Sequence, residues 1–210
     1  MSHVYAYGVV PEDEEFELER SGVGGAERIY TVTYRSLSAV VSDIDTTDPE
    51  RTDEAVETHN DVLQSVLESD GGRTVVPMGF GMAFKDARTL KGVVRGGQRA
   101  FRTALSEVEG TVELGLKLVS TGEGGPGRGE VEAVVDDTLG GIAVDEVEQD
   151  RFSDRLLVNR AYLVDRDDRE AFDAAVDDVE AVYDGELIVR YTGPWAPYNF
   201  VDIRIGTEGR

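Results

Sequence analysis

The chain has 210 residues, of which 40% are hydrophobic, and its 43 acidic against 21 basic residues give a formal net charge of −22. The apolar content supports a packed core in one large domain or two small ones, whereas the charge argues against binding to nucleic acid or to an anionic lipid membrane. Only three of the basic residues are lysines, and a composition this acidic and lysine-poor is typical of a high-salt cytoplasm, where dense salt screens the repulsion between carboxylates.

The beginning of the chain carries strand patterns. Val4–Val10 is rich in β-branched and aromatic residues and ends at Pro11, which predicts a first strand. The acidic and glycine-containing stretch 12–25 predicts a solvated loop. Residues 28–34 and 37–44 then predict the two strands of a hairpin.

A helix, a buried strand and a tight turn are expected next. Residues 53–69 place apolar side chains at helical spacing, with His59 among them. Residues 74–84 predict a short buried strand followed by a tight turn at Gly79 and Gly81. Further on, residues 112–120 alternate between apolar and other side chains, which predicts a half-buried strand.

The most clearly periodic helix is predicted over Asp86–Val108. Its apolar residues share one face, and five basic residues share the opposite face on a helical wheel, namely Arg88, Lys91, Arg95, Arg99 and Arg102. A stripe of one sign in a chain of the other sign is either paired internally or offered to an acidic partner. Both interpretations stay open, and the net charge disfavours nucleic acid as the partner.

The second half of the chain begins after a glycine-rich segment, residues 121–130, that predicts a linker. A short helix near 131–139, a central strand at 155–164, a helix at 167–183 and a strand at 186–191 follow. We therefore expect an α+β protein of two domains with helices on one face of each sheet. The first domain, residues 1–120, is ferredoxin-like, and the second, smaller one covers 131–210.

Residues 190–205, RYTGPWAPYNFVDIRI, predict a rigid corner between two strands. The only tryptophan, Trp195, lies between Pro194 and Pro197, and each proline fixes φ. The corner either caps the core or presents aromatic side chains to a partner, and both roles are compatible.

Residues that could carry chemistry are few. The absence of cysteine excludes disulfides and thiolate sites, and the two histidines, His3 and His59, make a weak case for a metal. For His59 we expect a structural role. The glycine-rich segment matches no phosphate-binding or dinucleotide motif. No apolar run is long enough to span a bilayer, and no signal peptide is visible. We therefore expect a cytoplasmic protein that is not an enzyme and uses no cofactor or metal.

Taken together, six stretches resemble the GvpF/GvpL family of gas vesicle proteins, and they span nearly the whole chain. In the family's order they are VYAYGVV at 4–10, HNDVLQSVL at 59–67, VVPMGFGMAF at 75–84, GTVELGLKL at 110–118, VNRAYLVDR at 158–166 and YTGPWAPYNFVDI at 191–203. The last is the most specific, because G-P-W-x-P-Y-x-F is unlikely by chance. The acidic composition is that of a haloarchaeal member.

The resemblance implies a non-catalytic accessory or minor component of gas vesicles. Family members are thought to bind the shell protein GvpA, limit its aggregation and join other accessory Gvp proteins in nucleating the vesicle. The partner-binding residues that we expect are the five basic residues above together with Tyr5, Tyr7, Phe80, Phe84, Trp195 and Tyr198. Trp195 and Tyr198 could instead lock the two domains together. The rival interpretation is a small-molecule-binding or enzymatic ferredoxin-like domain.

Overall fold

The computed structural model of the chain describes residues 3–11, 17–122, 125–183 and 185–203. The chain forms two compact units, each described here by itself. The first unit combines Met1–Glu109 with Ala196–Arg210, and the second consists of Gly110–Trp195. The second unit is therefore an insertion, in sequence, between two parts of the first.

The first unit is built on an antiparallel sheet with the strand order β2-β3-β4-β1-β5, in which β6 also pairs with β1. Its strands are β1 (His3–Pro11), β2 (Glu17–Leu18), β3 (Ile29–Tyr34), β4 (Leu37–Ile44), β5 (Val76–Pro77) and β6 (Ala83–Phe84). The predicted first strand and hairpin are confirmed. Gly8 follows a register shift in β1, and a Cβ atom there would lie 2.7 Å from the carbonyl oxygen of Val76. Only glycine lets β5 approach β1 this closely.

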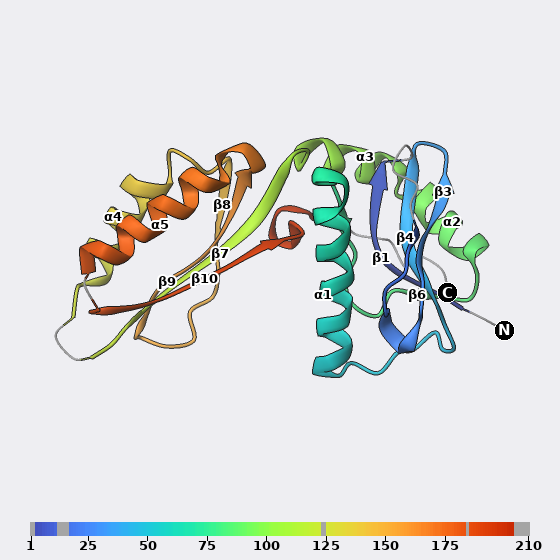
Figure 1. Cartoon of the computed structure of the whole chain (residues 1–210), viewed down its shortest axis with the longest axis horizontal. Helices are drawn as coiled ribbons and strands as arrows, with labels where there is room; N and C mark the ends of the chain where they lie inside the picture. Colours follow the sequence, from blue (N-terminus) through green and yellow to red (C-terminus); the bar gives the residue numbers. More distant parts are fainter. Residues whose placement is uncertain (1–2, 12–16, 123–124, 184, 204–210) are drawn as a thin grey trace. The chain divides into compact units, whose positions relative to one another are not determined.

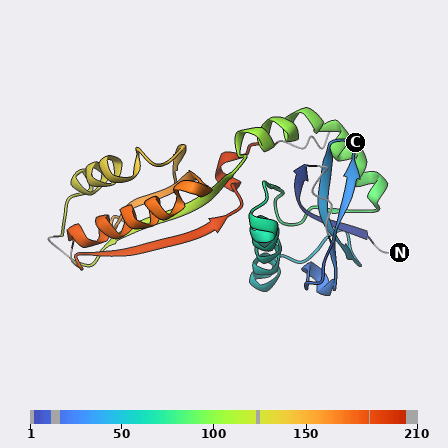
Figure 2. The ribbon, with the colours of Figure 1, turned by 45° about the horizontal axis from the view of Figure 1, so that its top comes forward.

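Helices cover both faces of this sheet, as Figures 1 and 2 show. They are α1 (Asp53–Glu68), α2 (Ala87–Gly96) and α3 (Gln98–Glu107). Alternate residues of β1 point to opposite faces: Tyr5 lies against His59 of α1, whereas Val4 and Ala6 belong to the core cluster formed with α2 and α3. The α+β class is confirmed, but the helices of this unit do not all lie on one face as expected.

The single helix predicted over residues 86–108 is two helices in the structure. The break falls at Gly97, whose φ and ψ are −93° and 6°. A Cβ atom at Gly97 would lie 2.9 Å from the buried ring of Phe101, so this position takes glycine. The helical periodicity of the apolar residues continues across the break, which is why the sequence alone did not reveal it.

The second unit is a four-stranded antiparallel sheet with the order β10-β7-β9-β8. Its elements are β7 (Thr111–Ser120), α4 (Arg128–Leu139), β8 (Asp145–Glu148), β9 (Leu156–Asp165), α5 (Arg169–Tyr183) and β10 (Leu187–Trp195). Helices α4 and α5 pack side by side on one face of the sheet (Figures 1 and 2). The buried ring of Phe172 on α5 contacts Tyr162 of β9, with ring centroids 5.2 Å apart. The predicted strand at 155–164 is central, whereas β8 was not predicted.

The division of the chain differs from the expected domains 1–120 and 131–210. Strand β7 pairs with β9 and β10 and lies inside the second sheet, not the first. Its alternating pattern predicted a strand correctly but carried no information on which strands pair with it. The glycine-rich segment 121–130 connects β7 to α4 within the second unit and does not separate the domains. Residues 123 and 124 of that segment lie outside the described residues.

The corner around Trp195 also differs from expectation. β10 continues through a cis Gly193–Pro194 bond to Trp195, which pairs with Glu113 of β7. The expected second strand is not formed over residues 198–203, which instead make a 3-10 turn at Tyr198–Phe200 and an extended stretch. The reason lies in packing, because Phe200, Val201 and Ile203 are half-buried against the core of the first unit. The rest of that predicted strand, residues 204 and 205, lies outside the described residues.

Candidate partner-binding surface

The basic residues of the predicted stripe lie on two consecutive helices of the first unit. Arg88, Lys91 and Arg95 are exposed on α2, and Arg99 and Arg102 are exposed on α3. None of the ion pairs found among the described residues involves any of the five. Internal pairing is therefore not what the described part of the chain shows, and the surface is available to a partner of opposite charge.

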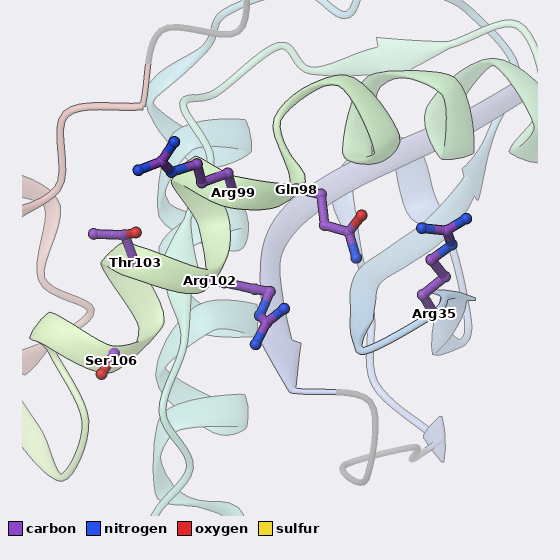
Figure 3. Close-up of a pocket in the computed structure, with 6 residues that line it drawn as sticks. All are labelled: Arg35, Gln98, Arg99, Arg102, Thr103 and Ser106. Atoms are coloured by element: carbon purple, nitrogen blue, oxygen red, sulfur yellow. The ribbon is translucent and has the colours of Figure 1, made fainter.

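The part of this surface formed by α3 contains a pocket. A pocket of about 540 Å³ is lined by Gln98, Arg99, Arg102, Thr103 and Ser106 of α3 together with Arg35 (Figure 3). Arg35 comes from the turn between β3 and β4, where its φ of 54° is in the left-handed region. The sequence analysis missed Arg35, because nothing in the local pattern connects a hairpin turn with a helix that begins more than sixty positions later.

The family motifs meet on the other face of the same sheet, around His59. The Nδ1 atom of His59 lies 2.8 Å from the hydroxyl oxygen of Tyr5, and its Nε2 atom lies 3.1 Å from the carbonyl oxygen of Met78. Nε2 is also 2.9 Å from the hydroxyl oxygen of Tyr198. Three stretches of the resemblance, from β1, the β5–β6 segment and the C-terminal corner, thus converge on one histidine of α1.

These partners define the protonation state of His59. The carbonyl of Met78 can only accept, so Nε2 carries the proton, and the unprotonated Nδ1 accepts from the Tyr5 hydroxyl. The Tyr5 oxygen in turn accepts from the backbone N–H of Gly81 at 3.2 Å. Burial lowers the pKa of His59 to about 4, because the charged imidazolium would lose its hydration. This satisfied, buried ring fits the structural role expected for His59.

The aromatic residues expected to touch a partner fall into different environments. Tyr5 and Tyr7 are fully buried, so direct contact of these two side chains with a partner is a wrong prediction for this structure. The Tyr7 hydroxyl forms a hydrogen bond with Ser42 Oγ at 2.8 Å and accepts a second hydrogen bond from the backbone N–H of Val23 at 2.9 Å. In the motif VYAYGVV, these two tyrosines therefore belong to the buried interior next to α1.

The other expected aromatic contacts are more accessible. Phe84 is half-buried against the core, and Phe80 is half-buried beside His59, with its ring face under the guanidinium of Arg51 at 5.5 Å. Trp195, the last residue of the second unit, is 37% exposed. Tyr198, which belongs to the first unit, is 38% exposed. The arrangement thus offers partially exposed aromatic surface in addition to the basic helices.

Metal binding and membrane insertion are two further possibilities to weigh for the described residues. No group of three or more histidine, aspartate or glutamate side chains there could hold a metal ion. In the same part of the chain, no helix combines the length and the apolar character that crossing a membrane requires.

Solved structures of known proteins define the class of fold. The chain superimposes on the crystal structure of gas vesicle protein GvpF from Anabaena sp. with a TM-score of 0.82, at 18% identity, over 97% of this chain and 100% of that one. The crystal structure of GvpF from Microcystis aeruginosa gives a TM-score of 0.83, at 18% identity, over 96% and 99% of the two chains. The two-unit α+β fold is thus the fold of GvpF proteins.

Sequence relatives are closer. Gas vesicle protein F of Haloferax mediterranei is 63% identical over 98% of this chain and 96% of its own length, and gas vesicle protein F1 of Halobacterium salinarum is 60% identical over the same shares. The family model described as "Gas vesicle synthesis protein GvpL/GvpF" matches residues 3–124 and 127–202. The chain belongs to the GvpL/GvpF family of gas vesicle synthesis proteins, which confirms the resemblance seen in the sequence.

Proposed function

We propose that this protein is an accessory factor of gas vesicle assembly, acting in the cytoplasm and at the vesicle. It binds the shell protein GvpA, limits its aggregation and, with other accessory Gvp proteins, helps to nucleate the vesicle wall. The observation that carries the proposal is the match to a gas vesicle synthesis family along almost the entire chain. That family is one of gas vesicle proteins and not a known enzyme family.

A role in keeping the shell protein from aggregating is physically plausible for a chain with this charge. A protein that forms a gas-tight wall exposes apolar surface before assembly, and such surface aggregates in water. A partner with a net charge of −22 keeps a complex dispersed even when dense salt screens part of that charge.

Two features of the first unit support one surface for this proposed binding. Addition of a strand to β1 is not available, because β1 pairs with β4 on one side and with β5 and β6 on the other. The exposed basic side chains of α2 and α3 remain, and they are complementary to an acidic segment of a partner. We therefore assign docking to α2 and α3, with Phe80 and Tyr198 as candidates for further aromatic contact.

The test is capture of GvpA by the immobilised full-length protein in multimolar KCl. Capture that saturates with GvpA concentration, together with less light scattering from GvpA on dilution out of denaturant, is the expected result. Circular dichroism in the same salt provides the control for folding. If the folded protein neither captures GvpA nor reduces its scattering, direct binding of the shell protein is excluded.

A further inference from the structure

The pocket beside α3 gathers positive charge from two distant parts of the first unit. Gln98 and Arg102 are four positions apart on α3 and lie on one side of the helix. Figure 3 shows the Gln98 amide between the guanidinium groups of Arg102 and Arg35, and Arg99 and Thr103 of the same helix also line the pocket. The donors of two guanidinium groups and one amide thus face the same space.

The charge of this pocket is unusual for the chain that carries it. Acidic residues outnumber basic ones by about two to one in the sequence, yet none of the six lining residues is acidic. Among the described residues, Arg35, Arg99 and Arg102 take part in no ion pair. Gathering like charges in a concave site is unfavourable unless an anion neutralises them.

The pocket is also partly pre-organised. The guanidinium of Arg35 lies over the ring of Tyr34, 5.6 Å from its centroid, and Arg35 is held in a left-handed turn between two paired strands. Arg102 projects from α3, which is anchored to the first unit by its buried residues Phe101 and Leu105. Side chains anchored on regular elements lose less freedom when they bind a ligand, which favours binding.

We propose that this pocket binds a small phosphorylated solute, with the phosphate group held between Arg35, Gln98 and Arg102. Guanidinium groups recognise phosphate oxygens in pairs, and a tetrahedral phosphate accepts from several directions at once, whereas a carboxylate offers two oxygens in one plane. The volume of about 540 Å³ lies in the range typical of small-molecule sites and leaves room for more than the phosphate group.

High salt sets the kind of anion that can occupy the pocket. In multimolar KCl, the attraction between two charges is screened once they are more than a few ångströms apart. Paired hydrogen bonds to a multiply charged anion resist that competition better than a single charge contact does. A ligand with two linked phosphate groups is therefore expected to bind more tightly than orthophosphate.

The experiment is calorimetric titration of the full-length protein with pyrophosphate in multimolar KCl. Orthophosphate and an acidic peptide of aspartate and glutamate serve as parallel arms. The variants are Arg102→Gln and Arg35→Asn, since asparagine tolerates the left-handed conformation of that turn. Arg128→Gln is the matched control, because Arg128 is exposed on α4 of the second unit, carries the same charge and does not line the pocket.

We expect saturable binding of pyrophosphate that becomes about tenfold weaker or more in each pocket variant, as the loss of a charge-assisted hydrogen bond predicts, and unchanged binding in Arg128→Gln. Absence of saturable binding, or equal weakening in Arg128→Gln, would overturn the proposal. Binding of the acidic peptide alone, lost in the same pocket variants, would also overturn it and would make the pocket a carboxylate site. None of these outcomes depends on capture of the shell protein.

Discussion

The side chains of His59 and Tyr198 are joined by a hydrogen bond of 2.9 Å between Nε2 and the phenolic oxygen, although the two residues are 139 positions apart. The Tyr198 hydroxyl also donates to Asn60 Oδ1 at 3.4 Å. Tyr198 lies just beyond the inserted second unit, so this bond attaches the returning chain to α1. The most specific sequence motif of the family thus has a structural role at one of its tyrosines.

Removal of the Tyr198 hydroxyl is expected to weaken the first unit. Tyr198→Phe keeps the ring but removes the hydroxyl that accepts a hydrogen bond from the Nε2–H of His59. We therefore expect the free energy of unfolding to fall by about 1 kcal/mol. Denaturant unfolding in multimolar KCl measures it. Tyr34→Phe is the control, because no hydrogen bond of its hydroxyl is found among the described residues. Equal stability of Tyr198→Phe and the unsubstituted protein would show that the bond contributes nothing.

Stability is expected to depend on pH through His59. Its pKa is about 4 in the folded protein, below the ordinary value of 6.5. Between these values the unfolded chain binds a proton that the folded protein does not, so the free energy of unfolding falls as pH decreases from about 6.5 to about 4. The shift corresponds to a loss of roughly 3 kcal/mol, and above pH 7 the effect is absent.

The matched variant for this measurement is His59→Gln, which does not titrate in that range. Unfolding of both proteins between pH 7 and pH 4.5 gives the difference, and subtraction removes the contribution of the carboxylates common to both. The variant starts from lower stability but loses less of it on acidification. Parallel pH profiles would rule out His59 as the titrating group.

Two glycines of the basic helices are expected to respond in opposite ways to alanine. Gly92 is exposed inside α2 with no atom near its missing Cβ, so Gly92→Ala should stabilise the protein by roughly 0.5–1 kcal/mol. Gly97→Ala places a methyl group 2.9 Å from the Phe101 ring and should destabilise it. Thermal unfolding of the two variants decides the question. Stabilisation by both would mean that the break at Gly97 is not required by packing.

Charge on α2 is expected to control partner capture. Arg88→Glu combined with Arg95→Glu reverses two exposed charges that do not line the pocket, so we expect weaker GvpA capture without loss of folding. Arg128→Glu, on the exposed start of α4, changes charge in the same direction elsewhere and should leave capture nearly unchanged. The double variant changes the net charge by four units and Arg128→Glu by two, so capture that falls in proportion to these changes would reflect net charge and not a docking surface.

The insertion of the second unit predicts how parts of the chain behave alone. Residues 110–195 contain all four strands of their sheet and both of its helices and should fold independently. Residues 1–109 lack Tyr198, Phe200, Val201 and Ile203 and should be less stable than a chain in which a short glycine–serine linker replaces 110–195. We expect a difference of about 2–4 kcal/mol from the lost burial and hydrogen bonding. Equal unfolding curves of the two shortened chains would contradict the role of 196–203.

Elements that depend on local pattern could be predicted from the sequence. Alternation in residues 112–120 and helical spacing in 53–69 led to β7 and α1, because each pattern is a property of one segment. The pairing of β7 with β9 and β10 is a long-range property that no local pattern encodes. The same limit applies to the site: the spacing of Arg99 and Arg102 was visible, but the pocket that they share with Arg35 depends on how α2 and α3 pack on the sheet.

The returning segment has a consequence for the order of synthesis. Ribosomes make chains from the N-terminus, and domains generally fold as units while they emerge. The second unit is complete once residue 195 has left the ribosome, whereas the first still lacks the residues that pack against its core and bond to His59. The unit whose synthesis begins first is therefore completed second, and its core gains these contacts only after the whole second unit has been made.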